Sequence, residues 1–193
     1  MTELVLQPTE TAHWHALVNE AQCAVACQLE ESLESYLVFL LIRFTRRPDM
    51  LTRIMASDYL ESQQNGKVYE AQLRDVGDHC LLLSGLFPIQ AERRRVSPGY
   101  FVDLGRRAYA EIAERGLHIS HALYADLARE FVMLMDTLQA IRNLSASNDA
   151  RLSPLQAYDQ WLSTGSLQAF NQLCSQSGAV PLTTDDSDSK TPH

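Results

Sequence analysis

Apolar residues recur at helical spacing along most of the chain, and this periodicity constrains the fold more than any other feature. Between residues 9 and 26, for example, Trp14, Leu17, Val18 and Ala21 share one face of an ideal helix. No segment alternates apolar and polar residues over the length of a strand. The pattern predicts an all-α fold: a compact multi-helix bundle of about seven or eight helices, with no significant β-sheet.

Proline, glycine and capping residues divide this pattern into separate helices. Ser97-Pro98 and Ser153-Pro154 each combine an N-cap residue with a proline at the first helical position, and Gly116 is placed as a C-cap. The predicted helices span about 9–26, 29–46, 50–63, 67–87, 98–114, 120–144, 154–162 and 165–175. The helix over 120–144 carries a heptad-like apolar stripe. Such a stripe packs lengthwise against a neighbouring helix, either of this chain or of a second copy in a homo-oligomer.

The chain is long enough for one well-filled core. Its 193 residues, of which 46% are hydrophobic and 21% charged, have the composition of an ordinary globular domain. We assign residues 1–180 to a single helical domain. Residues 181–193 are expected to form a disordered acidic and polar tail, because hydrophobic residues are absent from 183–193.

Several features predict a cytoplasmic protein without a membrane segment, metal or cofactor. The longest apolar run, residues 36–42, is far shorter than the roughly 20 residues that cross a bilayer. The first residues lack the positive charge and the cleavage site of a secretory signal. The sparse cysteines, Cys23, Cys27, Cys80 and Cys174, are typical of buried or half-buried thiols and do not have the paired spacing of zinc ligands.

The charge distribution predicts what kind of partner the protein would bind. The net charge is −8, and a protein this acidic is a poor match to the phosphates of nucleic acid. Five arginines nevertheless lie close together in the sequence: Arg93, Arg94, Arg95, Arg106 and Arg107. We predict that they form a basic patch that docks an acidic protein partner.

A second candidate site lies on the helix over 67–87. Asp75, Asp78 and His79 share one helical face, where a carboxylate could orient an imidazole as a base or ligand. Tyr100 and Tyr109 on the following helix would form a wall of the same ligand-binding groove. The alternative is a polar contact between helices, with Arg74 or an arginine of the 93–107 region as the partner of the carboxylates.

Part of the chain resembles a known group of proteins. The residues involved are Val76-Gly77-Asp78, Ser84-Gly85-Leu86-Phe87, and Tyr100-Phe101 followed by Gly105 and Ala108-Tyr109. This segment is similar to short helical bacterial proteins with the pattern V-G-D, S-G-F/L-F and Y-Y/F-x-x-x-G-x-x-A-Y, which have no established activity. The likeness covers about residues 36–115. It implies a bacterial origin and a helical fold, and it supplies no catalytic residue.

The sequence favours a non-enzymatic function. It lacks the phosphate-binding G-x-x-x-x-G-K-[ST], the dinucleotide-binding G-x-G-x-x-G, the hydrolase G-x-S-x-G and the metalloprotease H-E-x-x-H motifs. We therefore expect a helical protein that acts by protein–protein interaction, in a regulatory or adaptor role. The alternative is a ligand- or metal-binding bundle protein or enzyme, with its site between the helices of Gly77 and Tyr100.

Overall fold

The computed structural model describes residues 9–48, 66–88, 97–115, 119–145 and 151–177. Over these ranges the chain forms eight helices and no strand, which confirms the predicted all-α fold. The helices are α1 (Glu10–Ala24), α2 (Glu31–Arg46), α4 (Gly66–Gly85), α6 (Pro98–Arg115), α7 (Ile119–Arg129), α8 (Phe131–Ser145), α9 (Pro154–Thr164) and α10 (Leu167–Ser177). None of the helices in these ranges has a stretch apolar and long enough to span a bilayer. The predicted helix over 50–63 and the tail over 181–193 lie outside the described residues.

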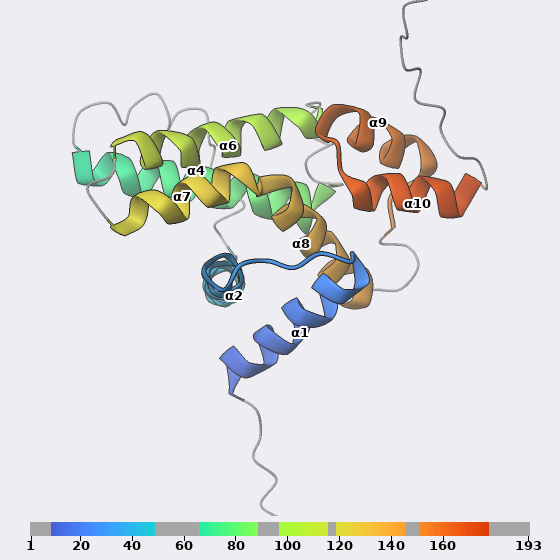
Figure 1. The fold of residues 1–193 in the computed structure, drawn as a ribbon, viewed down its shortest axis with the longest axis horizontal. Helices are drawn as coiled ribbons and strands as arrows, with labels where there is room; N and C mark the ends of the chain where they lie inside the picture. The colour runs from blue at the N-terminus through green and yellow to red at the C-terminus, as the bar shows by residue number, and fades with distance from the viewer. Residues whose placement is uncertain (1–8, 49–65, 89–96, 116–118, 146–150, 178–193) are drawn as a thin grey trace, which may run out of the picture.

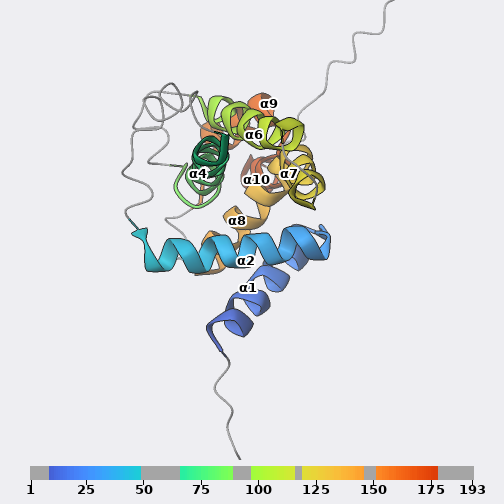
Figure 2. The same cartoon turned by 90° about the vertical axis from the view of Figure 1, so that its left-hand side faces the viewer.

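Six helices share the main hydrophobic core and form the body of the molecule: α1, α2, α4, α6, α7 and α8. α4, α6 and α7 run side by side, and α2 crosses beneath them, as the end-on and side views of α2 in Figures 1 and 2 show. α1 packs against both α2 and α8. α9 and α10 form a hairpin at one end of the molecule, where α9 meets α6 (Figure 1).

The helix ends follow the local signals in the sequence. The Oγ1 atom of Thr9 accepts a hydrogen bond from the Ala12 N–H at 3.3 Å and caps α1. Ser153 and Gln156 form a reciprocal capping box at the start of α9, ahead of Pro154 at the first helical position. α9 ends at Gly165, whose φ of 73° lies in the left-handed region that glycine adopts without strain.

Two glycines let large aromatic rings approach the helix backbones. A Cβ atom at Gly77 in α4 would lie 2.4 Å from the ring of Tyr109, and a Cβ atom at Gly105 in α6 would lie 2.5 Å from the ring of Phe131. Both rings are fully buried. Close packing therefore accounts for these two glycines.

The helix predicted over 120–144 is interrupted, which corrects the sequence interpretation. The chain forms α7 and α8 with a turn at Glu130 between them. Backbone hydrogen bonds continue on both sides of the turn, from the Glu130 N–H to the Asp126 carbonyl and from the Leu134 N–H to the Glu130 carbonyl. The two halves face different neighbours, since α7 packs mainly on α6 whereas α8 packs on α1 and α4. One straight helix cannot pack the same apolar stripe against α6 and against α1 and α4.

The α9–α10 hairpin has a small hydrophobic cluster of its own. Leu152, Ala157 and Leu173 are buried together, with Trp161 packed against them. This cluster is separate from the main core that joins the other helices. Apart from α9 on α6, the hairpin contacts the body through the start of α10, where Asp136 of α8 meets Ser166.

Candidate functional site

The predicted cluster around Asp78 forms a closed polar network. The Oδ1 atom of Asp78 accepts hydrogen bonds from the hydroxyl groups of Tyr36 and Tyr109, at 2.6 and 2.7 Å. The Oδ2 atom accepts from Nη2 of Arg43, which also forms an ion pair with it. Asp78 and Tyr109 are fully buried, and the Arg43 side chain is 30% exposed. One carboxylate of α4 is thereby joined to α2 and α6.

Burial and charge act in opposite directions on this carboxylate. Burial raises the pKa of Asp78, while the positive charge of Arg43 and the two tyrosine hydroxyl donors lower it. Burial, and then the charge of Asp78, raise the pKa values of Tyr36 and Tyr109 well above their ordinary value. Both tyrosines therefore keep the protons that they donate to Asp78.

This network fits the second interpretation of the cluster, a polar contact between helices. A ligand would have to displace Tyr36 or Tyr109 to reach Asp78, because these side chains already occupy the carboxylate. The arginine partner is Arg43, which the sequence interpretation did not select. A signal for it exists: Tyr36 and Arg43 are seven residues apart, share one helical face, and lie at either side of residues 37–42, which are all apolar. Polar groups on a buried face require partners.

The remaining predicted ligand residues do not gather at one place. Asp75 is exposed, and His79 is buried with 3% of its surface accessible. Tyr100 is 49% exposed, at the end of α6 that meets α9. At Gly77, the space between α4 and α6 is filled by the ring of Tyr109. The predicted residues that the structure brings into direct contact are Asp78 and Tyr109.

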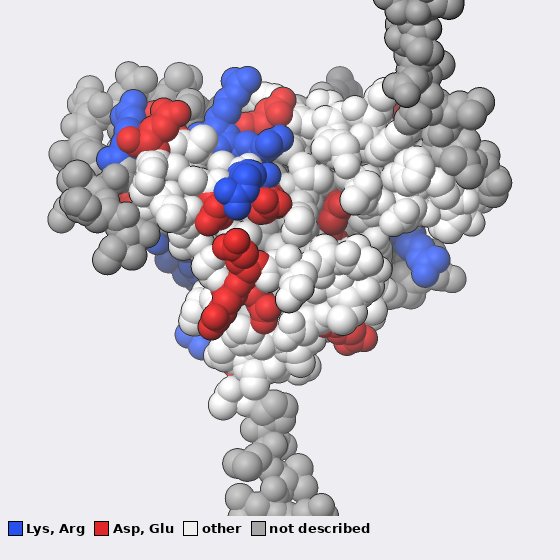
Figure 3. Space-filling model, in the orientation of Figure 1, with Lys and Arg blue, Asp and Glu red and all other residues white. Residues whose placement is uncertain are grey.

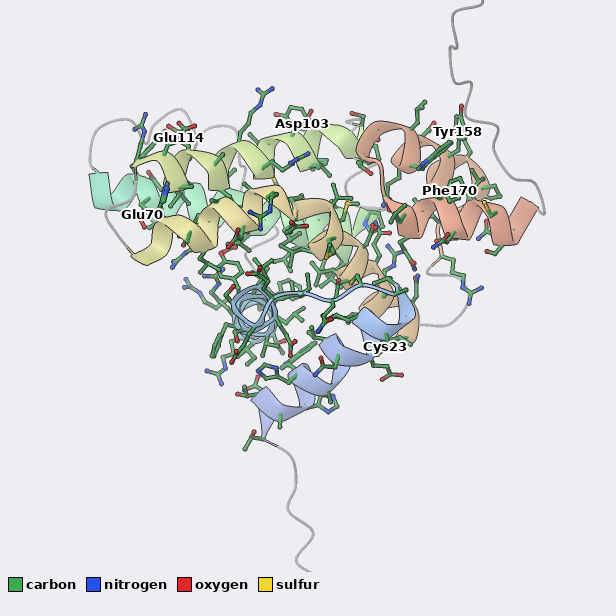
Figure 4. The ribbon with its side chains drawn as sticks, viewed as in Figure 1. Cys23, Glu70, Asp103, Glu114, Tyr158 and Phe170 are labelled. Atoms are coloured by element: carbon green, nitrogen blue, oxygen red, sulfur yellow. The ribbon has the colours of Figure 1, made fainter. Side chains whose placement is uncertain are left out.

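Two of the five arginines of the predicted patch are among the described residues. Arg93, Arg94 and Arg95 lie outside the described residues. Arg106 and Arg107 are exposed on α6, and Nε of Arg106 donates a hydrogen bond to the Ala128 carbonyl at 3.1 Å. Asp103 and Glu114 of the same helix, both labelled in Figure 4, are exposed as well. The docking role of the patch stays a prediction.

α9 exposes its leucine face and buries the opposite one, which is the reverse of an ordinary surface helix. Leu155 and Leu162 are 70% and 68% exposed, and Tyr158 between them is 42% exposed. The spacing of three and four residues places all three on one face. The opposite face, with Ala157 and Gln160, is buried. We call the exposed face formed by Leu155, Tyr158 and Leu162 the α9 face.

This orientation of α9 costs free energy in the isolated chain. Each leucine that stays exposed forgoes about 1.5–3 kcal/mol of burial free energy. Meanwhile the helix buries Gln160, whose Nε2 atom finds no hydrogen-bond partner in the described part of the chain. A buried amide group without a partner costs about 1–3 kcal/mol. Packing among the described residues therefore does not explain why α9 turns its leucines outward.

The surroundings of the α9 face are nearly uncharged. Residues 151–177 contain only two charged residues, Arg151 and Asp159. Figure 3 shows a largely white surface over α9 and α10, in contrast to the mixed red and blue surface over α6 and α7. The rings of Tyr158 and Trp161 lie 6.0 Å apart, and those of Trp161 and Phe170 lie 5.2 Å apart. Figure 4 labels Tyr158 and Phe170 at this end of the molecule, opposite the end with Glu70 and Glu114.

Asp136 fastens the hairpin to the body. Its carboxylate accepts hydrogen bonds from the Ser166 hydroxyl at 2.5 Å and from the Gln168 N–H at 3.3 Å. Ser166 in turn caps α10, because its Oγ accepts from the Ala169 N–H at 3.0 Å. Burial raises the pKa of Asp136 to about 6, against the opposing effect of these hydrogen bonds.

The raised pKa of Asp136 predicts a pH-dependent stability. An unfolded aspartate has a pKa of about 3.9, so the folded chain binds the proton more tightly. The free energy of unfolding should therefore fall as the pH rises from 4 to 6 (about 3 kcal/mol at most from this group). Urea unfolding of the wild type and of Asp136→Asn over this range would check this, because only the wild type carries the contribution. Parallel pH profiles for the two proteins would contradict it.

Comparisons with known proteins do not extend this picture. Neither a protein-family model, nor a curated protein sequence, nor a solved structure matches the chain. In the described ranges, no group of three or more His, Cys, Asp and Glu side chains is placed to hold a metal ion.

Proposed function

We propose that this protein is a protein-binding module, in a regulatory or adaptor role in a bacterial cytoplasm, and that the α9 face is its binding surface. The observation that carries the proposal is the inversion of α9. Leu155 and Leu162 point away from the body while Ala157 and Gln160 point into it. An exposed leucine face on a helix whose two fully buried residues are an alanine and a glutamine is typical of a surface that a partner covers.

The grouping of exposed apolar residues supports the proposal. Single exposed apolar side chains are common on protein surfaces and require no explanation. Phe39, Tyr100 and Leu144 are of this kind, since each is on a different helix. The other four large exposed apolar residues of the described ranges are in the hairpin: Leu155, Tyr158, Leu162 and Leu167. Such grouping favours an interface.

The chemistry of the face also suits a protein partner. Tyr158, Trp161 and Phe170 form a chain of contacting rings that runs from the exposed surface into the hairpin. Aromatic residues are enriched in the parts of interfaces that contribute most to affinity, and charged residues are depleted there. The rigid rings lose little conformational entropy on binding, so they can anchor an apolar partner segment.

The test is a comparison of three tagged proteins as bait for cellular partners. Leu155→Glu/Leu162→Glu places two charges on the α9 face, and Phe39→Glu places one on α2, where the side chain is 62% exposed. We expect the wild type and Phe39→Glu to retain the same proteins and the double variant to lose them. Circular dichroism would establish that all three baits are folded. Equal recovery by all three folded baits would refute the α9 face as the binding surface.

A further inference from the structure

We infer that the partner of the α9 face is a second copy of this chain, bound through an antiparallel pair of α9 helices. This inference rests on the proposed function and names its partner. In such a pair, a two-fold axis passes between residues 158 and 159. Leu155 of one copy then faces Leu162 of the other, because both are equally far along the helix from the axis. The two Tyr158 rings meet beside the axis.

The charge distribution supports a second copy. Two molecules that each carry a net charge of −8 repel one another, and residues 1–42 alone hold six glutamates and no basic residue. Residues 151–177 add no net charge, since they contain one basic and one acidic residue, Arg151 and Asp159. Two copies can therefore approach through the hairpins at little electrostatic cost. Figure 3 shows this largely uncharged surface over α9 and α10.

Asp159 adds a feature that distinguishes this pairing from others. It follows Tyr158 in the sequence and is exposed at the flank of the α9 face. A two-fold axis perpendicular to the helix pair brings the two Asp159 carboxylates to the same side, near each other. Their repulsion weakens the pair, and water and salt screen it. Asp159→Asn should therefore tighten self-association about two- to fivefold.

The interface is small, so the association should be reversible and weak. One pair of short helices buries less than the area of a standard stable interface (about 1,200–2,000 Å²). Part of the gain from burying leucine and tyrosine offsets the lost freedom of two molecules. We expect a dissociation constant in the micromolar range.

Sedimentation equilibrium of the purified full chain tests the inference. We expect the wild type and Phe39→Glu to pass from monomer to dimer as the concentration rises through the micromolar range. Leu155→Glu/Leu162→Glu should raise the dissociation constant about tenfold or more. A wild type that stays monomeric throughout, or a double variant that dimerises as tightly as the wild type, would overturn the inference.

Thiol cross-linking tests the antiparallel register. Leu155→Cys and Leu162→Cys proteins, both with Cys23→Ser and Cys174→Ser, are mixed and treated with a short bismaleimide. We expect cross-linked dimers mainly between the two different proteins, because residues 155 and 162 face each other. Cross-links mainly within each protein would indicate a parallel pair and overturn the register.

The outcomes separate this inference from the proposed function. Suppose that the purified wild type is monomeric but the double variant still loses cellular partners that the wild type retains. Then the inferred dimer is wrong, and the α9 face remains the binding surface for another protein. If the wild type is monomeric and all three baits retain the same proteins, both are wrong.

Discussion

Replacing Asp78 with alanine is expected to lower the free energy of unfolding by about 3–5 kcal/mol. The variant leaves the buried hydroxyl groups of Tyr36 and Tyr109 without their acceptor and removes the ionic partner of Arg43. Each buried donor that loses its partner costs about 1–3 kcal/mol, and the loss of charge pairing adds to this. A small domain has a total stability of about 5–15 kcal/mol, so the variant should lose a large part of it.

Guanidinium unfolding followed by circular dichroism would measure this effect, with Asp78→Asn as the matched control. The amide keeps the size of the side chain and one oxygen acceptor, but it carries no charge for Arg43. We expect its loss of stability to lie between the wild type and Asp78→Ala. A loss below about 1 kcal/mol for Asp78→Ala would show that the network does not hold α2, α4 and α6 together.

Replacing Gly77 with valine is expected to cost about 2–4 kcal/mol. The valine Cβ would begin 2.4 Å from the ring of Tyr109, which is fully buried and already contacts the rings of Tyr36, Tyr124 and Phe131. Overpacking costs about 1–3 kcal/mol, and the displaced ring also loses its hydrogen bond to Asp78 (about 1 kcal/mol). Helix propensity favours valine over glycine by only a few tenths of a kcal/mol, so packing decides the sign.

A double-mutant cycle with Tyr109→Leu tests the cause of this loss. If the clash with the ring is responsible, Gly77→Val should cost much less in the Tyr109→Leu background than in the wild type. An equal cost in both backgrounds would show that the destabilisation arises elsewhere. Unfolding midpoints of the four proteins in urea give the coupling energy.

Local signals predicted most helix boundaries correctly because they act over a few residues. Ser153-Pro154 forms the expected start of α9 with a complete capping box, and α6 begins at Pro98 after Ser97. The bend at Glu130 has no such signal. It arises because α7 and α8 contact different helices, and a heptad stripe in the sequence does not record which neighbour covers each half.

The candidate sites show the same limit. Sequence spacing selected Asp78 and Tyr109, which do meet, but the hydroxyl of Tyr36 and the guanidinium of Arg43 come from a helix about 40 residues earlier. Long-range partners of buried polar groups depend on how helices cross. The orientation of α9 is harder still to predict from the sequence. Its sequence shows an apolar stripe and a polar stripe, and a soluble domain would ordinarily bury the apolar one.

The stability of Leu155→Glu/Leu162→Glu tests most directly the central claim that the α9 face serves a partner and not the fold. The two leucines are 70% and 68% exposed, and a glutamate near the start of α9 gains from the helix dipole about what one near its end loses. We therefore predict, for the monomer at low concentration, a free energy of unfolding within about 0.5 kcal/mol of the wild type. A loss of several kcal/mol would place the leucines in the core and contradict the claim.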